Sequence, residues 1–134
     1  MAEPNASSIE LQVATPEREL VREPVSEIQV PALDGYLGVL PGHAALVSRL
    51  GTGALSYQAG GKKTYLAIQG GFVEVLPDRV RVLADVAERG SEIDVAQARA
   101  QLAEAQAQLP KAAPEAGLAA VALAEARIAA ATAC

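Results

Sequence analysis

The sequence has little that could cross-link the chain, hold a metal or catalyse a reaction. Its 134 residues include one cysteine, Cys134, and one histidine, His43. A single cysteine excludes a disulfide framework and a paired zinc motif, and it is typical of a reducing compartment. A catalytic histidine needs an orienting acid and a nucleophile or metal, and no such motif accompanies His43. We therefore expect no enzymatic activity, no metal site and a loop or contact role for His43.

Positive charge and long apolar runs are also scarce. Eleven Lys and Arg oppose sixteen Asp and Glu, which gives a net charge of -5, and the basic residues are scattered. Nucleic acids and anionic lipids are bound by clustered cations, so neither is an expected partner. No window reaches the ~18 apolar residues of a membrane-spanning helix. The first eight residues also lack the basic and apolar regions of a signal peptide. We expect a soluble protein that meets a membrane only through a partner.

Turn signals are abundant between residues 34 and 55. Five glycines and Pro41 separate short apolar runs there, a density that is typical of a chain reversing between strands. Pro41 fixes φ for the first central position of a turn, and Gly42 can supply the positive φ that a type II turn needs at the second. The sequence thus predicts that His43 lies at a loop end.

The first 90 residues predict a sheet. Ile9, Leu11 and Val13 alternate with less apolar residues, as in a half-buried strand. Further short apolar runs, each bounded by Pro, Gly or Asp, predict strands at 19–23, 25–30, 35–40, 45–50, 53–58, 62–69, 72–76 and 79–86. Gly60-Gly61 and Pro77-Asp78 fit hairpin turns. Strands at such close spacing, without helices between them, favour an antiparallel sandwich or barrel.

Composition changes at residues 89–91, and residues 94–134 contain 18 alanines in 41 positions. Alanine has the highest helix propensity, so we expect two helices. Asp94 suits the N-cap of the first, residues 110–114 should end it, and Pro114 and Glu115 suit the first turn of the second. A link this short predicts an antiparallel hairpin. The expected domains are residues 1–90, a β-sandwich, and residues 91–134, a helical hairpin.

A 3-4 spacing of apolar residues predicts the seam between the two helices. Its members are Val95, Ala98, Leu102, Ala105 and Leu109 on the first helix, and Leu118, Val121, Ala124, Ile128 and Ala131 on the second. An alanine methyl buries much less area than a leucine side chain, so such a seam allows close approach but holds weakly. This fits either a permanently packed terminal hairpin or a helical element that can leave its resting place.

Gly70-Gly71 does not have the features of a phosphate-binding loop. It lacks the lysine and the following helix of such loops, and the chain continues as Phe72-Val-Glu-Val-Leu76. A bulge or a close backbone approach explains the pair better.

Three segments resemble one known family. They are Gly-Tyr-Leu-Gly-Val-Leu-Pro-Gly-His-Ala-Ala-Leu at 35–46, Gly-Gly-Phe-Val-Glu-Val at 70–75 and Val-Leu-Ala-Asp-Val-Ala-Glu at 82–88. Together they look like the epsilon subunit of F-type ATP synthases, the orthologue of the mitochondrial delta subunit. The resemblance runs from about Ile9 to the last helix.

The resemblance implies a rotor subunit whose sandwich clamps the gamma subunit and rests on the membrane-embedded c-ring. By motif position, Asp34, Gly35 and Tyr36 would approach the c-ring. The surface facing gamma would include Leu40, Pro41, Gly42 and His43. Family members often have an acid where Tyr36 stands, and a tyrosine is an amphipathic alternative suited to an interface.

Some bacterial members of this family bind ATP through an Ile/Leu-Asp-x-x-Arg-Ala signature. Here Ile93 and Asp94 match, but Gln97 stands where the arginine is expected. Arg99 lies two residues on, about 200° around a helix, and the second helix offers only Arg127. We therefore expect no cofactor and regard Asp94 as a helix cap.

In many members the two helices extend along the stalk and hinder ATP hydrolysis at the alpha/beta head through basic residues. Residues 94–134 carry Arg99, Lys111 and Arg127 against four acids, a net charge of -1. The sequence therefore favours a steric brake that depends little on salt.

Two other classes stay open from the residues alone. One is a free-standing β-sandwich binding module with a helical oligomerisation tail, and the other is an enzyme of unrecognised type. The resemblance implies a peripheral location on the cytoplasmic face of a bacterial inner membrane, or on a thylakoid or mitochondrial inner membrane.

Overall fold

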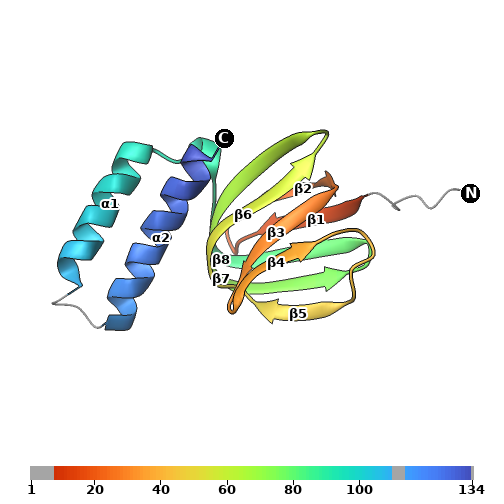
Figure 1. The fold of residues 1–134 in the computed structure, drawn as a ribbon, viewed down its shortest axis with the longest axis horizontal. Helices are drawn as coiled ribbons and strands as arrows, with labels where there is room; N and C mark the ends of the chain where they lie inside the picture. The colour runs from red at the N-terminus through yellow and green to blue at the C-terminus, as the bar shows by residue number, and fades with distance from the viewer. Residues whose placement is uncertain (1–7, 110–113, 134) are drawn as a thin grey trace, which may run out of the picture.

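The computed structural model describes residues 8–109 and 114–133. It shows a β-sandwich followed by two helices (Figure 1), which confirms the expected fold class. A single turn, η1 (Gly90–Glu92), connects the sandwich to α1 (Val95–Gln108) and α2 (Pro114–Thr132). The strands are β1 (Ile9–Ala14), β2 (Glu19–Val25), β3 (Glu27–Ala32), β4 (Gly35–Val39), β5 (Leu46–Arg49), β6 (Thr52–Ala59), β7 (Lys62–Leu76) and β8 (Arg79–Arg89).

The strands form one open sheet that folds over into two layers. Their order is β2-β1-β8-β7-β6-β3-β4, and β5 pairs with β7. Residues 62–69 of β7 pair with β6, whereas residues 72–75 pair with β5, so β7 passes from one layer into the other. β8 pairs with residues 66–76 of β7, a stretch that includes parts of both layers. The pair β1 and β8 is parallel, so the expected antiparallel arrangement is wrong for this one pair.

The sequence predicts two strands at 62–69 and 72–76, but the structure has the single strand β7. Its pairing with β8 keeps one register through the glycines, from Gln69 opposite Val86 to Gly71 opposite Ala84. Both glycines have positive φ, and a Cβ on Gly71 would overlap the carbonyl oxygen of Leu83. Gly70-Gly71 is therefore a close backbone approach that lets β7 bend without breaking.

The core lies between the two layers and follows the alternation of the strands. The largest fully buried side chains there are Ile9, Leu11, Val13, Val25, Ile28, Val30, Val39, Leu55, Leu66, Ile68, Val73 and Val75. Gly60 and Gly61 both have positive φ between β6 and β7, as a tight hairpin requires, so the predicted turn is confirmed. Branched apolar side chains on a pleated surface thus build the rigid part of the molecule.

The helices form a hairpin on one side of the sandwich (Figure 1). Asp94 caps α1, since its Oδ1 accepts a hydrogen bond from the backbone nitrogen of Gln97 at 3.1 Å. Pro114 and Glu115 begin α2, as predicted. α2 packs on β6 and β7, and α1 packs on α2 farther from the sheet. No helix in residues 8–109 and 114–133 is long and apolar enough to cross a membrane.

Candidate functional site

Asp34 lies in the turn between β3 and β4, and Gly35 is the first residue of β4; both are exposed. Tyr36 lies farther back. Its hydroxyl accepts a hydrogen bond from the backbone nitrogen of Ala54 at 3.0 Å. With Gly53 and residues of α2 it lines a shallow pocket of about 240 Å³ at the edge of the docked helix. Of the three residues predicted to contact the c-ring, Asp34 and Gly35 are exposed at the turn, whereas the side chain of Tyr36 is hydrogen-bonded to β6.

The loop of Leu40, Pro41, Gly42 and His43 has the predicted turn. Gly42 has φ 86°, and the backbone nitrogen of His43 donates to the carbonyl oxygen of Leu40 at 3.2 Å. Gly42 also donates to Pro77 O at 2.8 Å, which fixes this loop to the turn between β7 and β8. The ring nitrogen Nδ1 of His43 lies 2.7 Å from the carbonyl oxygen of Ala44. His43 is thereby held by its own loop.

An apolar patch lies on the outer face of β5, β7 and β8. It was not predicted from the sequence. We define the apolar patch as Val47, Phe72 and Leu83, which are 69%, 55% and 48% exposed. Phe72 is opposite Arg49 on one side and Leu83 on the other. The signal was present in the alternation, because Val73 and Val75 point into the core and their neighbours must point outward.

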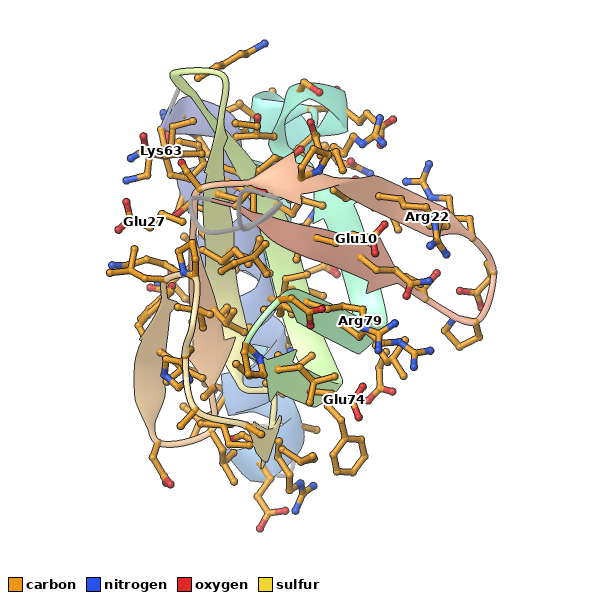
Figure 2. The ribbon with its side chains drawn as sticks, turned by 90° about the vertical axis from the view of Figure 1, so that its right-hand side faces the viewer. Glu10, Arg22, Glu27, Lys63, Glu74 and Arg79 are labelled. Atoms are coloured by element: carbon orange, nitrogen blue, oxygen red, sulfur yellow. The ribbon has the colours of Figure 1, made fainter. Side chains whose placement is uncertain are left out.

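Charged residues surround the apolar patch. Glu74 forms an ion pair with Arg81 at 3.8 Å, and Arg79 stands opposite Glu10 on the neighbouring strand β1. Figure 2 shows Glu10, Arg22, Glu74 and Arg79 on one side of the sandwich. An apolar centre with a charged rim is the anatomy of a protein interface.

The helix seam consists largely of small side chains. Ala98, Ala105 and Ala124 are buried, whereas Val95, Leu102, Leu109, Val121, Ile128 and Ala131 are half-buried. The prediction that Leu118 lies in the seam is wrong, because its side chain is 59% exposed. Gly117 is buried in its place, and a Cβ there would lie 2.8 Å from Cδ2 of Leu109. A Cβ at position 117 would require the side chain of Leu109 to shift. Gly117 therefore occupies the seam position, and Leu118 faces outward.

Arg127 joins three elements at the inner end of the hairpin. Its Nε donates to Oε1 of Glu88 on β8 at 2.8 Å, and its Nη2 donates to Oε2 of the same carboxylate at 3.2 Å. On α1 it donates to Oε1 of Gln101 at 2.8 Å and to Oε1 of Gln97 at 3.3 Å. The sequence alone does not predict this cluster, since Glu88 and Arg127 are 39 positions apart.

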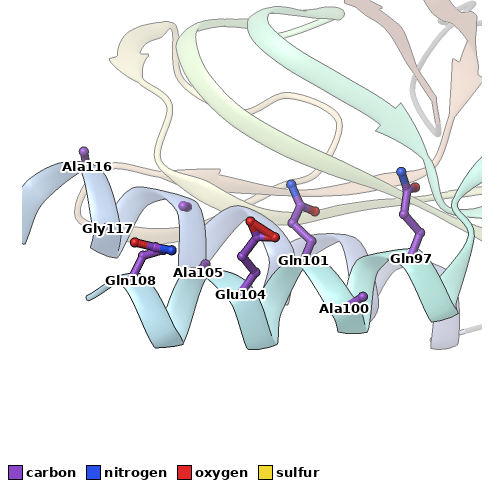
Figure 3. Close-up of a pocket in the computed structure, with 9 residues that line it drawn as sticks. Gln97, Ala100, Gln101, Glu104, Ala105, Gln108, Ala116 and Gly117 are labelled. Atoms are coloured by element: carbon purple, nitrogen blue, oxygen red, sulfur yellow. The ribbon is translucent and has the colours of Figure 1, made fainter. Parts of the chain in front are cut away.

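The groove between the helices is lined by small and polar residues. It has a volume of about 550 Å³ and is lined by small residues, three glutamines and Glu104. Figure 3 shows Gln97, Gln101, Glu104 and Gln108 along α1 beside it. A triphosphate needs cations or a run of free backbone N–H groups. Among residues 8–109 and 114–133, no lysine or arginine lines the groove. Arg127 is engaged by Glu88, and Asp94 caps its helix.

Comparison with known proteins identifies the family. Residues 8–90 match the family described as ATP synthase, Delta/Epsilon chain, beta-sandwich domain. The chain belongs to this family. The ATP synthase epsilon chain of Solibacter usitatus is 64% identical over 93 residues, 69% of this chain and 69% of that protein. The epsilon chain of Koribacter versatilis is 47% identical over 94 residues, 70% of this chain and 66% of that protein.

A solved structure extends the likeness over both parts of this chain. A chain in the Euglena gracilis mitochondrial ATP synthase, described as OSCP/F1/c-ring in rotational state 1, has a TM-score of 0.80 and 29% identity. The match covers 93% of this chain and 82% of that one. A share this large includes residues beyond the sandwich, so the likeness to that chain extends into the hairpin.

Proposed function

We propose that the chain is a central-stalk subunit of an F-type ATP synthase, where it couples rotation of the c-ring to the gamma subunit and the catalytic head. The family and the Euglena assembly support this role. The observation that carries it is the apolar patch on a rigid sandwich whose opposite layer is covered by the hairpin. Transmitting torque requires a stiff body with separate contact surfaces. In this proposal the subunit is non-catalytic and lies at the membrane periphery, on the cytoplasmic face in a bacterium.

The gamma subunit is the partner that we assign to the apolar patch. β5 follows directly after the loop of Leu40, Pro41, Gly42 and His43, and Gly42 is hydrogen-bonded to Pro77 beside β7. The loop therefore adjoins the strands that carry Val47 and Phe72. Together they make one surface with an apolar centre, as a stable subunit contact needs.

The c-ring is the partner that we assign to the tip of the β3–β4 loop. Asp34 and Gly35 are exposed there, and Leu33 adds an exposed apolar side chain. Tyr36 stays a predicted contact, but its bond to Ala54 supports a second task as a brace under the loop. The surfaces assigned to gamma and to the c-ring include different loops. One rigid sandwich can therefore bind gamma and the c-ring at the same time.

A charge placed in the apolar patch tests the proposed contact with gamma. We expect Phe72→Asp to weaken binding to purified gamma subunit about 30-fold or more, the loss typical of a buried hot spot. The side chain is exposed in the free chain, so the melting temperature should change little. Titration calorimetry with gamma measures the affinity.

The matched control is Leu118→Asp, which adds the same charge at another exposed leucine, on α2. We expect it to bind gamma like the parent. Equal weakening by both variants, or parental binding by Phe72→Asp, would contradict the assignment.

We also propose that the hairpin is a brake on ATP hydrolysis that acts by inserting an apolar helix into the catalytic head. Deleting residues 94–134 should raise hydrolysis by the assembled complex. With the full chain, the inhibited fraction should stay constant from about 0.01 M to about 0.15 M salt, although the Debye length falls from about 30 Å to about 8 Å. Steady-state hydrolysis measures this, and a brake that such salt abolishes would show that charge pairing drives it.

A further inference from the structure

The contact between the hairpin and the sheet is poor in apolar area. Its cluster consists of Ala67 on β7, Ile93, Ala98, Ala126 and Ala130, with Ala54, Tyr65, Ile128 and Ala131 packed against it. Most members are alanines, and each alanine methyl buries little area. Burial alone therefore holds α2 on the sheet only weakly.

The Arg127 cluster is the strongest polar connection across this contact. The side chain of Arg127 is 12% exposed and that of Glu88 is 30% exposed, so solvent screens the pair less than a surface ion pair. Two parallel N–H···O bonds between a guanidinium and a carboxylate are strong and orientation-specific. Among the described residues, the other polar link from α2 to the strands is one neutral bond, from Gln69 Nε2 to the carbonyl oxygen of Ala119 at 3.1 Å.

The same arginine also fastens α1, although α1 is farther from the sheet. Gln97 and Gln101 lie four residues apart and so share one face of α1, and both amide oxygens accept from Arg127. Releasing Arg127 from Glu88 therefore loosens both helices from β8 as one unit. Gln97 therefore has a structural role here, because its side-chain oxygen accepts a hydrogen bond from Arg127 on α2.

We propose that Glu88, Gln97, Gln101 and Arg127 form a latch that keeps the hairpin docked on the sandwich, with the ion pair as its essential bond. The regulatory meaning of the latch rests on the proposed brake: an engaged latch withholds the helices from the catalytic head, and a released latch makes them available. In this proposal the docked hairpin is stabilised by side chains of the chain itself.

Label distances in the isolated full-length chain test the latch. Spin labels at Arg79→Cys on β8 and Ala107→Cys on α1, in a Cys134→Ser background, report whether the hairpin is docked; both label sites are exposed. We expect Arg127→Ala and Glu88→Ala each to raise the ratio of separated to docked molecules about tenfold, between the effects of exposed and buried ion pairs.

Two further variants separate the latch from charge and folding effects. Arg99→Ala removes one positive charge from the exposed face of α1, and it should leave the distances unchanged. The exchange Glu88→Arg with Arg127→Glu should restore docking, because the pair is reversed and the amides of Gln97 and Gln101 can donate to a carboxylate. Unchanged distances in Arg127→Ala, or no rescue by the exchange, would overturn the latch.

A hydrolysis assay separates the latch from the brake. In the assembled complex, Arg127→Ala should lower ATP hydrolysis relative to Arg99→Ala, because more hairpins are free to extend. If the label distances shift while hydrolysis stays equal, the latch stands and the proposed brake fails. If hydrolysis falls while the distances are unchanged, the latch is wrong and the brake has another trigger.

Discussion

Replacing Gly71 with alanine is expected to lower the free energy of unfolding of the sandwich by about 3 to 5 kcal/mol. Gly71 has φ +108°, which L-residues rarely adopt, and its Cβ would lie 2.9 Å from Cα of Ala84 and closer still to the carbonyl oxygen of Leu83. Those atoms belong to the backbone of β8 and cannot rotate away. Because domains of this size are stable by only about 5 to 15 kcal/mol, the loss should be visible in urea or thermal unfolding.

Two other glycines are controls that separate the backbone angle from the steric contact. Gly60 has φ +59° with open space around its Cβ position, and Gly38 has open space without a positive φ. Gly60→Ala should cost about 1 kcal/mol, and Gly38→Ala should change stability by less than about 0.5 kcal/mol. If Gly71→Ala unfolds at the same denaturant concentration as Gly38→Ala, the bend of β7 does not depend on this close approach.

Replacing Gly90 with alanine is expected to release the hairpin while the sandwich stays folded. A Cβ at Gly90 would overlap the carbonyl oxygen of Ala130 and lie 2.8 Å from its carbonyl carbon. Ala130 belongs to α2, which rests on the sheet through alanines and the Arg127 latch, so the helix can relieve the overlap by moving away. Overpacking of this kind costs about 1 to 3 kcal/mol, which changes the ratio of separated to docked molecules by about 5-fold to about 160-fold.

The label pair used for the latch measures this release, and thermal unfolding measures the sandwich. The predicted pattern is longer label distances with a sandwich transition close to that of Gly38→Ala. In the assembled complex, Gly90→Ala should also lower the rate of ATP hydrolysis if the hairpin is the proposed brake. Parental distances would show that α2 tolerates the methyl group, and a sandwich transition as low as that of Gly71→Ala would show that Gly90 serves the sheet instead.

Local features of the fold were predictable because short sequence patterns determine them. Alternation in Ile9–Ala14 predicted β1, the Gly60-Gly61 pair predicted a tight hairpin, and Asp94 predicted the start of α1. Each depends on backbone angles or side-chain spacing within a few residues. The boundaries at Gly70-Gly71 were wrong because a glycine pair inside a strand has the same local signature as a turn.

Long-range features could not be predicted in the same way. The parallel pairing of β1 with β8 joins residues about 70 positions apart, and no local pattern distinguishes it from an antiparallel neighbour. The bonds of Arg127 to Glu88 and of Tyr36 to Ala54 depend on how the elements dock. The apolar patch was within reach of the sequence, since Phe72 alternates with buried valines, but the strand assignment alone did not show which outward residues form one surface.

Purification of the tagged chain from native energy-coupling membranes tests the central claim most directly. We predict one copy of the chain per complex, recovered with the gamma subunit and the c-ring, and cross-links from the apolar patch to gamma. Recovery of the chain as a free monomer or homo-oligomer, without a rotary complex, would contradict it.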